Sequence, residues 1–81
     1  MSDMPRLRWL CRRGMKELDV VLETYLERRY ESAPGDEQQA FRDLLELPDP
    51  QLYGLLLGRE EAAGEPARSL VETLRTITAR D

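Results

Sequence analysis

Apolar residues recur at steps of three and four along most of this 81-residue chain. That spacing is the period of an amphipathic α-helix, in which such residues share one face. The clearest case runs from Met15 to about Arg29. Its apolar face comprises Met15, Leu18, Leu22, Tyr25 and Leu26. Period-two alternation of useful length does not occur, so the pattern predicts an all-α protein.

Glycine and proline residues divide this pattern into separate helices. Pro5 suits a first helical turn, and Gly14 suits the end of that short first helix because glycine adopts the left-handed conformation at little cost. The pattern breaks again at residues 32–35. Asp36 then follows as the expected N-cap of a third helix, with Gln39 three residues later completing a capping box. The core face of this helix comprises Phe41, Leu44 and Leu45.

A fourth helix is expected after Asp49, which would serve as its N-cap, with Pro50 at the first helical position. Gly58 is expected to close it. The segment is apolar nearly all round, so we expect it to be the central and most buried element, with Gly54 allowing another backbone to approach closely. Its apolar residues are Leu52, Tyr53, Leu55, Leu56 and Leu57.

A fifth helix is expected to begin at Pro66, after a charged loop over residues 59–65. Its apolar residues are Leu70, Val71, Leu74 and Ile77. A chain of this length can form one small domain. We therefore predict a single helical domain over residues 1–81, built as a compact bundle of five short helices.

The composition argues against an ordinary enzyme. Histidine is absent, which removes the commonest general base and the commonest metal ligand. Cysteine occurs once, at Cys11, so the chain can form neither an internal disulfide nor a CxxC metal site. Cys11 is interpreted as a small buried hydrophobic residue, with a reactive thiol as the alternative. We predict no catalytic residue and no metal site.

Charge is distributed unevenly along the chain. Residues 6–16 contain five basic and no acidic side chains, whereas residues 17–81 contain seven basic and fifteen acidic ones. Such an acidic surface disfavours nucleic acid as a partner, but the short basic segment can still meet an anionic protein surface. The longest apolar run, residues 55–57, is three residues, so we expect no insertion into a membrane.

Four acidic residues recur at steps of four along the second predicted helix. They are Asp19, Glu23, Glu27 and Glu31. Neighbouring like charges at this spacing destabilise a helix slightly. One interpretation is that the stripe is a solvated face, some of whose carboxylates pair with arginines of an adjacent helix. The alternative is that it binds a basic surface of a partner protein.

The stretch from Arg13 to Glu17 offers the most specific candidate site. A sharp turn at Gly14 would place Arg13 at the end of one helix and Glu17 in the first turn of the next, opposite much of the apolar stripe and therefore outward. An exposed guanidinium and carboxylate beside a bare glycine could bind another protein, or could form an ordinary surface ion pair. Nearby Trp9 either anchors the first helix to the core or faces a partner.

The same stretch resembles a known protein family. Arg13, Gly14 and Glu17 match the RGxxE signature of the SdhE family, whose members are flavinylation (FAD assembly) factors for succinate dehydrogenase. The wider block from Arg6 to Asp19 also resembles that family. Residues 44–53, which contain an LLE…DPxL pattern, resemble the family as well.

The resemblance implies a function as well as a fold. Members of the family are small five-helix proteins that bind the flavoprotein subunit of succinate dehydrogenase, and in bacteria also that of fumarate reductase. They promote covalent attachment of FAD to a histidine of this client. The FAD accordingly belongs to the client and is not bound stably by the factor, with direct flavin contact as the less favoured alternative. The chain is thus identified with a bacterial, cytoplasmic factor that is a monomer when free.

The resemblance also assigns partner-binding residues. Arg13 and Glu17 would make charge-assisted contacts near the client's flavin site, while Gly14 would allow close approach. Flanking contacts would come from Arg8, Trp9 and Asp19. A different class of function is kept as an alternative, namely an antitoxin-type regulatory module that binds a toxin or a cytoskeletal partner.

Overall fold

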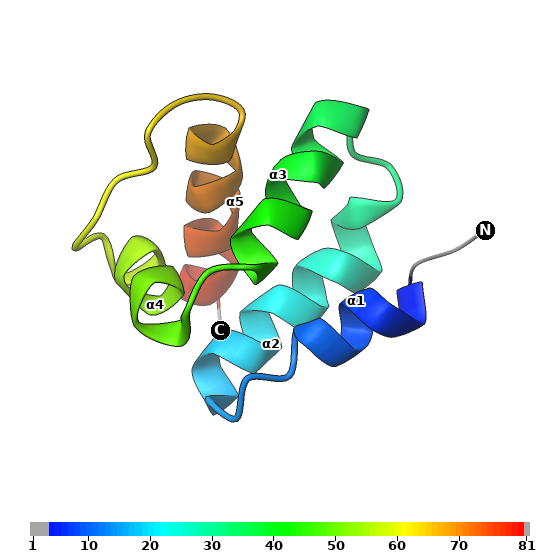
Figure 1. Cartoon of the computed structure of the whole chain (residues 1–81), viewed down its shortest axis with the longest axis horizontal. Coiled ribbons are helices and arrows are strands. Elements are labelled where there is room, and N and C mark those ends of the chain that lie inside the picture. The colour runs from blue at the N-terminus through cyan, green and yellow to red at the C-terminus, as the bar shows by residue number, and fades with distance from the viewer. Residues whose placement is uncertain (1–3, 81) are drawn as a thin grey trace.

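Five α-helices and one π-helical segment account for most of the protein, as a computed structural model shows (Figure 1). The structure describes residues 4–80, and the side chains of residues 4–77. The elements are α1 (Met4–Leu10), α2 (Lys16–Tyr25), the π-helical segment η1 (Leu26–Tyr30), α3 (Gly35–Leu45), α4 (Asp49–Leu57) and α5 (Ala67–Arg80). No strand occurs within the described residues. The predicted all-α, five-helix fold is confirmed.

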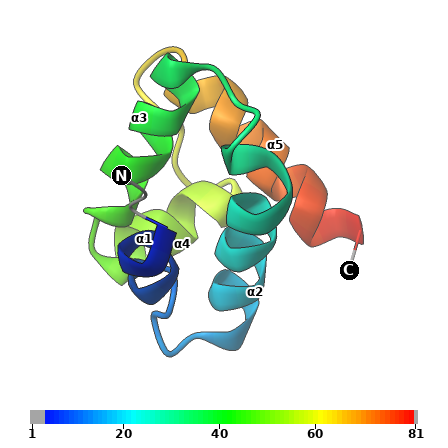
Figure 2. The ribbon, with the colours of Figure 1, turned by 90° about the vertical axis from the view of Figure 1, so that its right-hand side faces the viewer.

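Helix α5 contacts more of the molecule than the expected central helix does. It packs against α2, α3 and α4 (Figures 1 and 2), and its inward face buries Leu70, Val71 and Leu74. The prediction that the fourth helix is central and most buried is therefore wrong. Helix α4 lies at one end of the bundle, and Leu57 remains 45% exposed. A helix that is apolar all round but packed on one side leaves apolar surface uncovered.

Helix α2 and its π-helical extension supply much of the core. Their buried side chains are Leu18, Val21, Leu22, Tyr25, Leu26 and Tyr30. The rings of Tyr25 and Tyr30 lie against Phe41 of α3, with ring centroids 4.6 and 5.6 Å apart. These tilted aromatic contacts join α2 and η1 to α3. The predicted second helix is thus confirmed as one continuous helical segment whose last turn widens to π geometry.

Two predicted N-caps are wrong by one or two residues. Pro34 and Pro48 are the N-cap residues of α3 and α4, with ψ angles of 156° and 151°. Proline prefers this extended conformation and has no N–H to leave unpaired, so it suits the position before the first helical residue. Asp36 instead lies inside the first turn, where its carboxylate accepts the N–H of Glu37. Asp49 is the first residue of α4, and its carboxylate is engaged elsewhere.

Three glycines have distinct local roles. Gly14 and Gly58 both adopt a φ of +81°, and Gly58 is the C-cap of α4, as predicted. The predicted end of the first helix at Gly14 is wrong, because α1 already ends at Leu10 and Gly14 lies in the connecting segment. Gly54 is buried, but a side chain rather than a second backbone approaches it. A Cβ at this position would lie 2.7 Å from Oε2 of Glu60. The loop after α4 therefore folds back over Gly54.

Candidate functional site at the turn between α1 and α2

The turn between α1 and α2 is open to solvent. Gly14 lies in it with a positive φ, and a Cβ added there would meet nothing within 4 Å. A non-glycine residue would fit sterically into this space but would be strained by the left-handed backbone. The predicted sharp turn with accessible backbone is therefore present.

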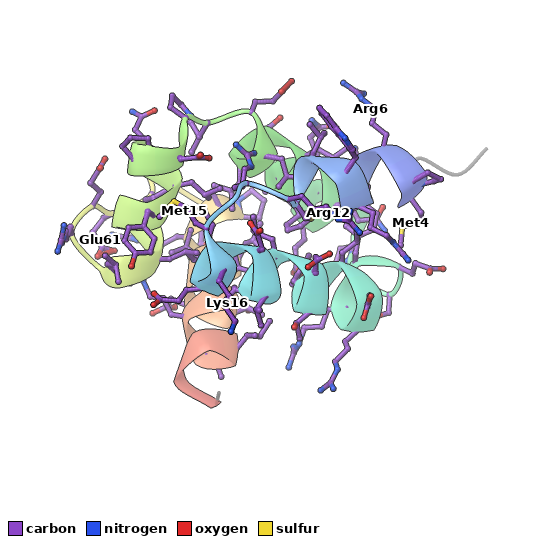
Figure 3. All side chains as sticks on the ribbon, turned by 90° about the horizontal axis from the view of Figure 1, so that it is seen from below. Met4, Arg6, Arg12, Met15, Lys16 and Glu61 are labelled. Carbon is purple, nitrogen blue, oxygen red and sulfur yellow. The ribbon has the colours of Figure 1, made fainter. Side chains whose placement is uncertain are left out.

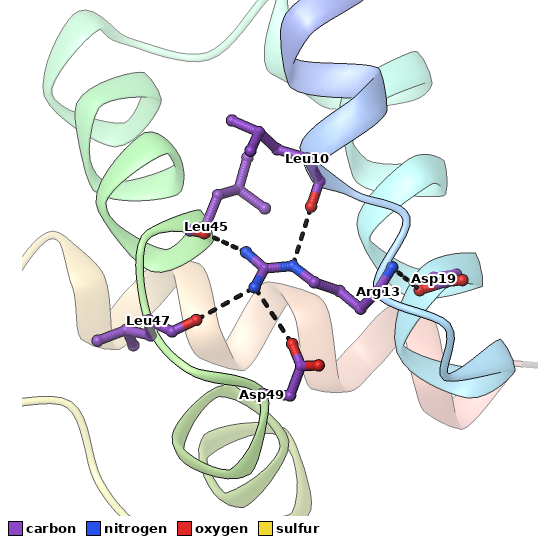
Figure 4. A network of polar contacts seen from close by, with 6 residues as sticks. All are labelled: Leu10, Arg13, Asp19, Leu45, Leu47 and Asp49. Carbon is purple, nitrogen blue, oxygen red and sulfur yellow. Dashed lines mark hydrogen bonds and ion pairs between the residues drawn. The ribbon is translucent and has the colours of Figure 1, made fainter.

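Arg13 does not point outward as expected, and this part of the prediction is wrong. Its side chain is only 14% exposed and lies between α1 and the α3–α4 connection (Figure 4). The guanidinium donates to the carbonyl oxygens of Leu10 (2.9 Å), Leu47 (3.2 Å) and Leu45, and to Oδ1 of Asp49 (3.2 Å). A guanidinium with these partners is held inside the protein and does not form an ion pair with Glu17.

These contacts make Arg13 a link between three helices. Leu10 and Leu45 are the last residues of α1 and α3, so their carbonyls lack the usual intrahelical partners. A cation at a helix C-terminus is also favoured by the helix dipole. Asp49 begins α4. The spacing of the motif gave no sign that Arg13 turns inward. Its partners on α3, on α4 and between these helices lie 32 to 36 residues further along the chain.

Asp19 fixes the turn from the other side. Its Oδ1 accepts the backbone N–H of Arg13 at 2.7 Å, so the first turn of α2 is tied to the middle of the connecting segment. Further along the acidic stripe, Glu23 lies 4.0 Å from Nε of Arg12. One arginine side chain, that of Arg12 in the preceding segment, thus pairs with part of the stripe, while Glu27 and Glu31 are exposed.

Other predicted site residues do face solvent. Leu7 and Cys11 are buried one helical turn apart, which directs Arg8 and Trp9 away from the core. Trp9 is 72% exposed, so it does not anchor α1. The exposed side chains of Arg6 and Arg12 lie on either side of α1, with Arg12 toward α2 (Figure 3). This part of the surface combines several guanidinium groups with one large aromatic ring.

Glu17 is exposed, as predicted, and it has a partner that the sequence analysis missed. The hydroxyl of Tyr53 in α4 donates to Oε2 of Glu17 at 3.1 Å. This hydrogen bond and the negative charge of Glu17 raise the pKa of Tyr53. Tyr53 lies in the second block of the family resemblance, and a polar hydroxyl within an apolar helix is the signal that could have indicated it.

Cys11 is fully buried. Burial raises the pKa of its thiol from 9.0 to about 12, with a smaller contribution from Glu23. The thiol is therefore protonated at neutral pH and unsuited to nucleophilic chemistry. This confirms the interpretation of Cys11 as a small hydrophobic core residue.

Within residues 4–80, no cluster of three or more histidine, cysteine, aspartate or glutamate side chains could hold a metal ion. The same described residues contain no helix long and apolar enough to cross a bilayer. What the turn does present is an aromatic ring, guanidinium groups, accessible backbone and a carboxylate. Such a set is suited to recognising another protein, with the aromatic ring as an anchor. Fold and site together define a small helical protein-binding module.

Comparison with known proteins identifies the family. Residues 5–78 match the family described as flavinator of succinate dehydrogenase, and the chain belongs to this family. It is 40% identical over 82 residues to an FAD assembly factor SdhE of Yersinia pseudotuberculosis, covering 100% of this chain and 89% of that protein. A protein of the same name from Methylococcus capsulatus is 40% identical over 80 residues, covering 99% and 96%.

A third relative has a lower sequence identity, but the match again covers most of both chains. The FAD assembly factor SdhE of Coxiella burnetii is 35% identical over 74 residues, which is 91% of this chain and 90% of that protein. The family that the two sequence blocks resemble is therefore the family to which the chain belongs.

Proposed function

We propose that this protein is an assembly factor that binds the flavoprotein subunit of succinate dehydrogenase and promotes covalent attachment of FAD to a histidine of that subunit. The match of residues 5–78 to the flavinator family is the observation that carries this proposal. The relatives named above are FAD assembly factors, and none of them is named as an antitoxin. The factor itself is not an enzyme, since the attacking histidine belongs to the client.

The client-binding surface is formed by Arg8, Trp9, Gly14 and Glu17. Exposure of these residues around one turn supports this assignment. Trp9 supplies a large apolar area for burial against the client, and Gly14 allows backbones to meet. Arg13 and Asp19 contribute indirectly, because their hydrogen bonds hold the turn in place.

Binding would act on the client's conformation. A factor that binds one client conformation more tightly than others increases the population of that conformation. If this is the conformation in which histidine and the flavin ring meet, attachment becomes faster because the reacting groups are already oriented. The basic side chains of α1 would draw an acidic client surface toward this site.

FAD is proposed to remain with the client. A hollow of about 670 Å³ lies between α3 and the segment before α5. Its wall includes Asp36, Asp43 and Glu65, whose negative charge would repel a pyrophosphate. We further propose that the protein is a monomer when free, acts in the bacterial cytoplasm, and can also serve the flavoprotein subunit of fumarate reductase.

Co-expression tests the function directly. The flavoprotein subunit of succinate dehydrogenase is expressed with and without the chain, and covalent flavin is measured by in-gel fluorescence. We expect the chain to increase the fluorescence and Trp9→Ala to reduce that increase. Glu72→Ala, at an exposed position on α5, is the matched control and should behave as wild type. Equal fluorescence with and without the chain would refute the function.

A further inference from the structure

Among the described residues, three large apolar side chains are exposed, one on each of α1, α2 and α4. They are Trp9, Val20 and Leu57, with exposures of 72%, 40% and 45%. Trp9 belongs to the client-binding surface proposed above. The other two follow the hydrogen-bonded pair Glu17 and Tyr53 by about one helical turn each, Val20 on α2 and Leu57 on α4. Residues so spaced are neighbours on a helix surface.

The surface is hollowed on both sides of the Glu17–Tyr53 pair. One recess of about 240 Å³ is lined by Met15, Lys16, Glu17 and Tyr53. A second recess of about 30 Å³ lies between α2 and α4. Its lining residues are Glu17, Leu18, Val21, Tyr53, Leu56 and Leu57. The second recess is apolar apart from the carboxylate and the hydroxyl, and its volume suits the tip of one aliphatic side chain.

We propose that the client-docking surface continues from the Gly14 turn across the Glu17–Tyr53 pair to Leu57 on α4. There it accepts an aliphatic side chain of the flavoprotein, with an adjacent cationic or N–H group of the client donating to Glu17. This inference rests on the proposed function. The client is the occupant because Glu17 belongs to both parts of the surface, so a partner that covers the turn is already in contact with the second recess.

Within this surface Tyr53 is a positioning residue. Its hydroxyl donates to Oε2 of Glu17, and one such bond still leaves a carboxylate able to accept from a partner. Holding the carboxylate before the client arrives reduces the side-chain entropy that binding would otherwise cost. Tyr53 therefore acts through Glu17, and its effect should vanish when Glu17 can no longer accept in the same way.

Binding of the purified, FAD-loaded flavoprotein subunit to immobilised variants tests the proposal. We expect Leu57→Ser to weaken binding about tenfold through loss of an apolar contact. Tyr53→Phe, which removes only the hydroxyl, should weaken it about threefold in the wild-type background. In a Glu17→Ala background, which removes the acceptor, Tyr53→Phe should have no further effect, a result that a merely structural role would not produce. Circular dichroism confirms that each variant is folded.

Trp9→Ala serves as the reference for the turn itself, and Glu72→Ala as the control outside the surface. If Trp9→Ala weakens binding while Leu57→Ser and Tyr53→Phe bind as wild type, the extension to α4 is overturned and the proposed function stands. If the wild-type chain fails to bind the flavoprotein at all, the proposed function fails. Self-association of the free chain that disappears in Leu57→Ser would assign the recess to a second copy and also overturn the extension.

Discussion

At the scale of single residues, the RGxxE motif divides into an inward and an outward half. Arg13 is enclosed and bonded to carbonyls at the ends of two helices, while Glu17 is exposed and bonded only to Tyr53 among the hydrogen bonds described. Gly14 between them provides the left-handed turn that separates the two directions. The motif thus contains an enclosed scaffold residue and an exposed residue four positions apart.

Arg13→Ala should lower the free energy of unfolding by about 2–4 kcal/mol. The variant leaves the carbonyls of Leu10, Leu45 and Leu47 and the carboxylate of Asp49 without their donor, and unsatisfied buried groups are costly. Urea unfolding followed by circular dichroism measures the change. Arg68→Ala, at an exposed position on α5, is the control and should stay within about 0.5 kcal/mol of wild type. Equal stability of the two variants would contradict the scaffold role.

The raised pKa of Cys11 predicts a loss of stability at alkaline pH. The unfolded thiol titrates near 9.0 and the folded thiol near 12, so the folded state holds more protons between these values. Unfolding therefore becomes easier as pH rises through about 9. Between pH 9 and 10, wild type should lose about 1 kcal/mol more than Cys11→Ala does. Urea titrations of both proteins at each pH measure this difference, and parallel losses would show that Cys11 is not responsible.

At the scale of elements, α4 is held at both ends by guanidinium groups from other parts of the chain. Arg13 bonds to Asp49 at its start. Arg75 of α5 donates to the carbonyl of Leu55 near its end, at 2.9 and 2.7 Å, and to the carbonyl of Glu60 at 3.2 Å. The Arg75 bonds tie the end of α4 and the loop that follows it to α5. They explain how a nine-residue helix at the edge of the bundle keeps a defined position.

Arg75→Ala should loosen the end of α4 before it affects the rest of the fold. Loss of three charge-assisted bonds should cost about 1–3 kcal/mol. Hydrogen exchange measured by mass spectrometry should show that the variant accelerates exchange, relative to wild type, more in residues 55–60 than in α2. Arg75→Lys should recover part of the protection, because an ammonium group can replace one of the donors. Uniform acceleration across all helices would indicate a global effect instead.

At the scale of the whole molecule, exposed basic side chains are concentrated on α1 and the segment after it. Arg6, Arg8 and Arg12 lie there, whereas Glu61 lies at the other end of the molecule beside Arg75 (Figure 3). A basic region of this kind attracts an acidic partner surface and orients the molecule as it approaches. When the partner surface is acidic, this orientation turns the side of the molecule that carries Trp9 toward the partner.

Association with the flavoprotein should accordingly depend on ionic strength. We expect the association rate to fall as salt is raised, with a smaller change in the dissociation rate, because exposed charges act mainly on encounter. Surface plasmon resonance at several salt concentrations measures both rates. Arg8→Gln should flatten the salt dependence, whereas Arg68→Gln on α5 should leave it unchanged. An association rate that does not respond to salt would contradict electrostatic steering.

Local patterns in the chain were sufficient to predict the helices but not their neighbours. Helical periodicity indicated the helices, and Gly58 indicated where α4 ends, because these signals act within a few residues. Gly14 marked the turn but not the end of α1, which stops at Leu10. The N-caps at Pro34 and Pro48 were missed, since an aspartate one or two residues after a proline resembles a cap equally well. The central position expected for α4 was wrong, because hydrophobicity indicates a tendency to be buried and does not say which elements are available to cover a helix.

By itself, the sequence determined the all-α class, the order of the helices, the inert character of Cys11 and, through two matched blocks, the family. Each follows from short-range periodicity, backbone preference or side-chain chemistry. Only the tertiary structure decided that Arg13 turns inward, that Trp9 faces solvent, and that Tyr53 bonds to the outward-facing Glu17. The contacts of Arg13 and Glu17 depend on hydrogen-bond partners more than thirty residues away, which come within reach only when the chain has packed into its bundle.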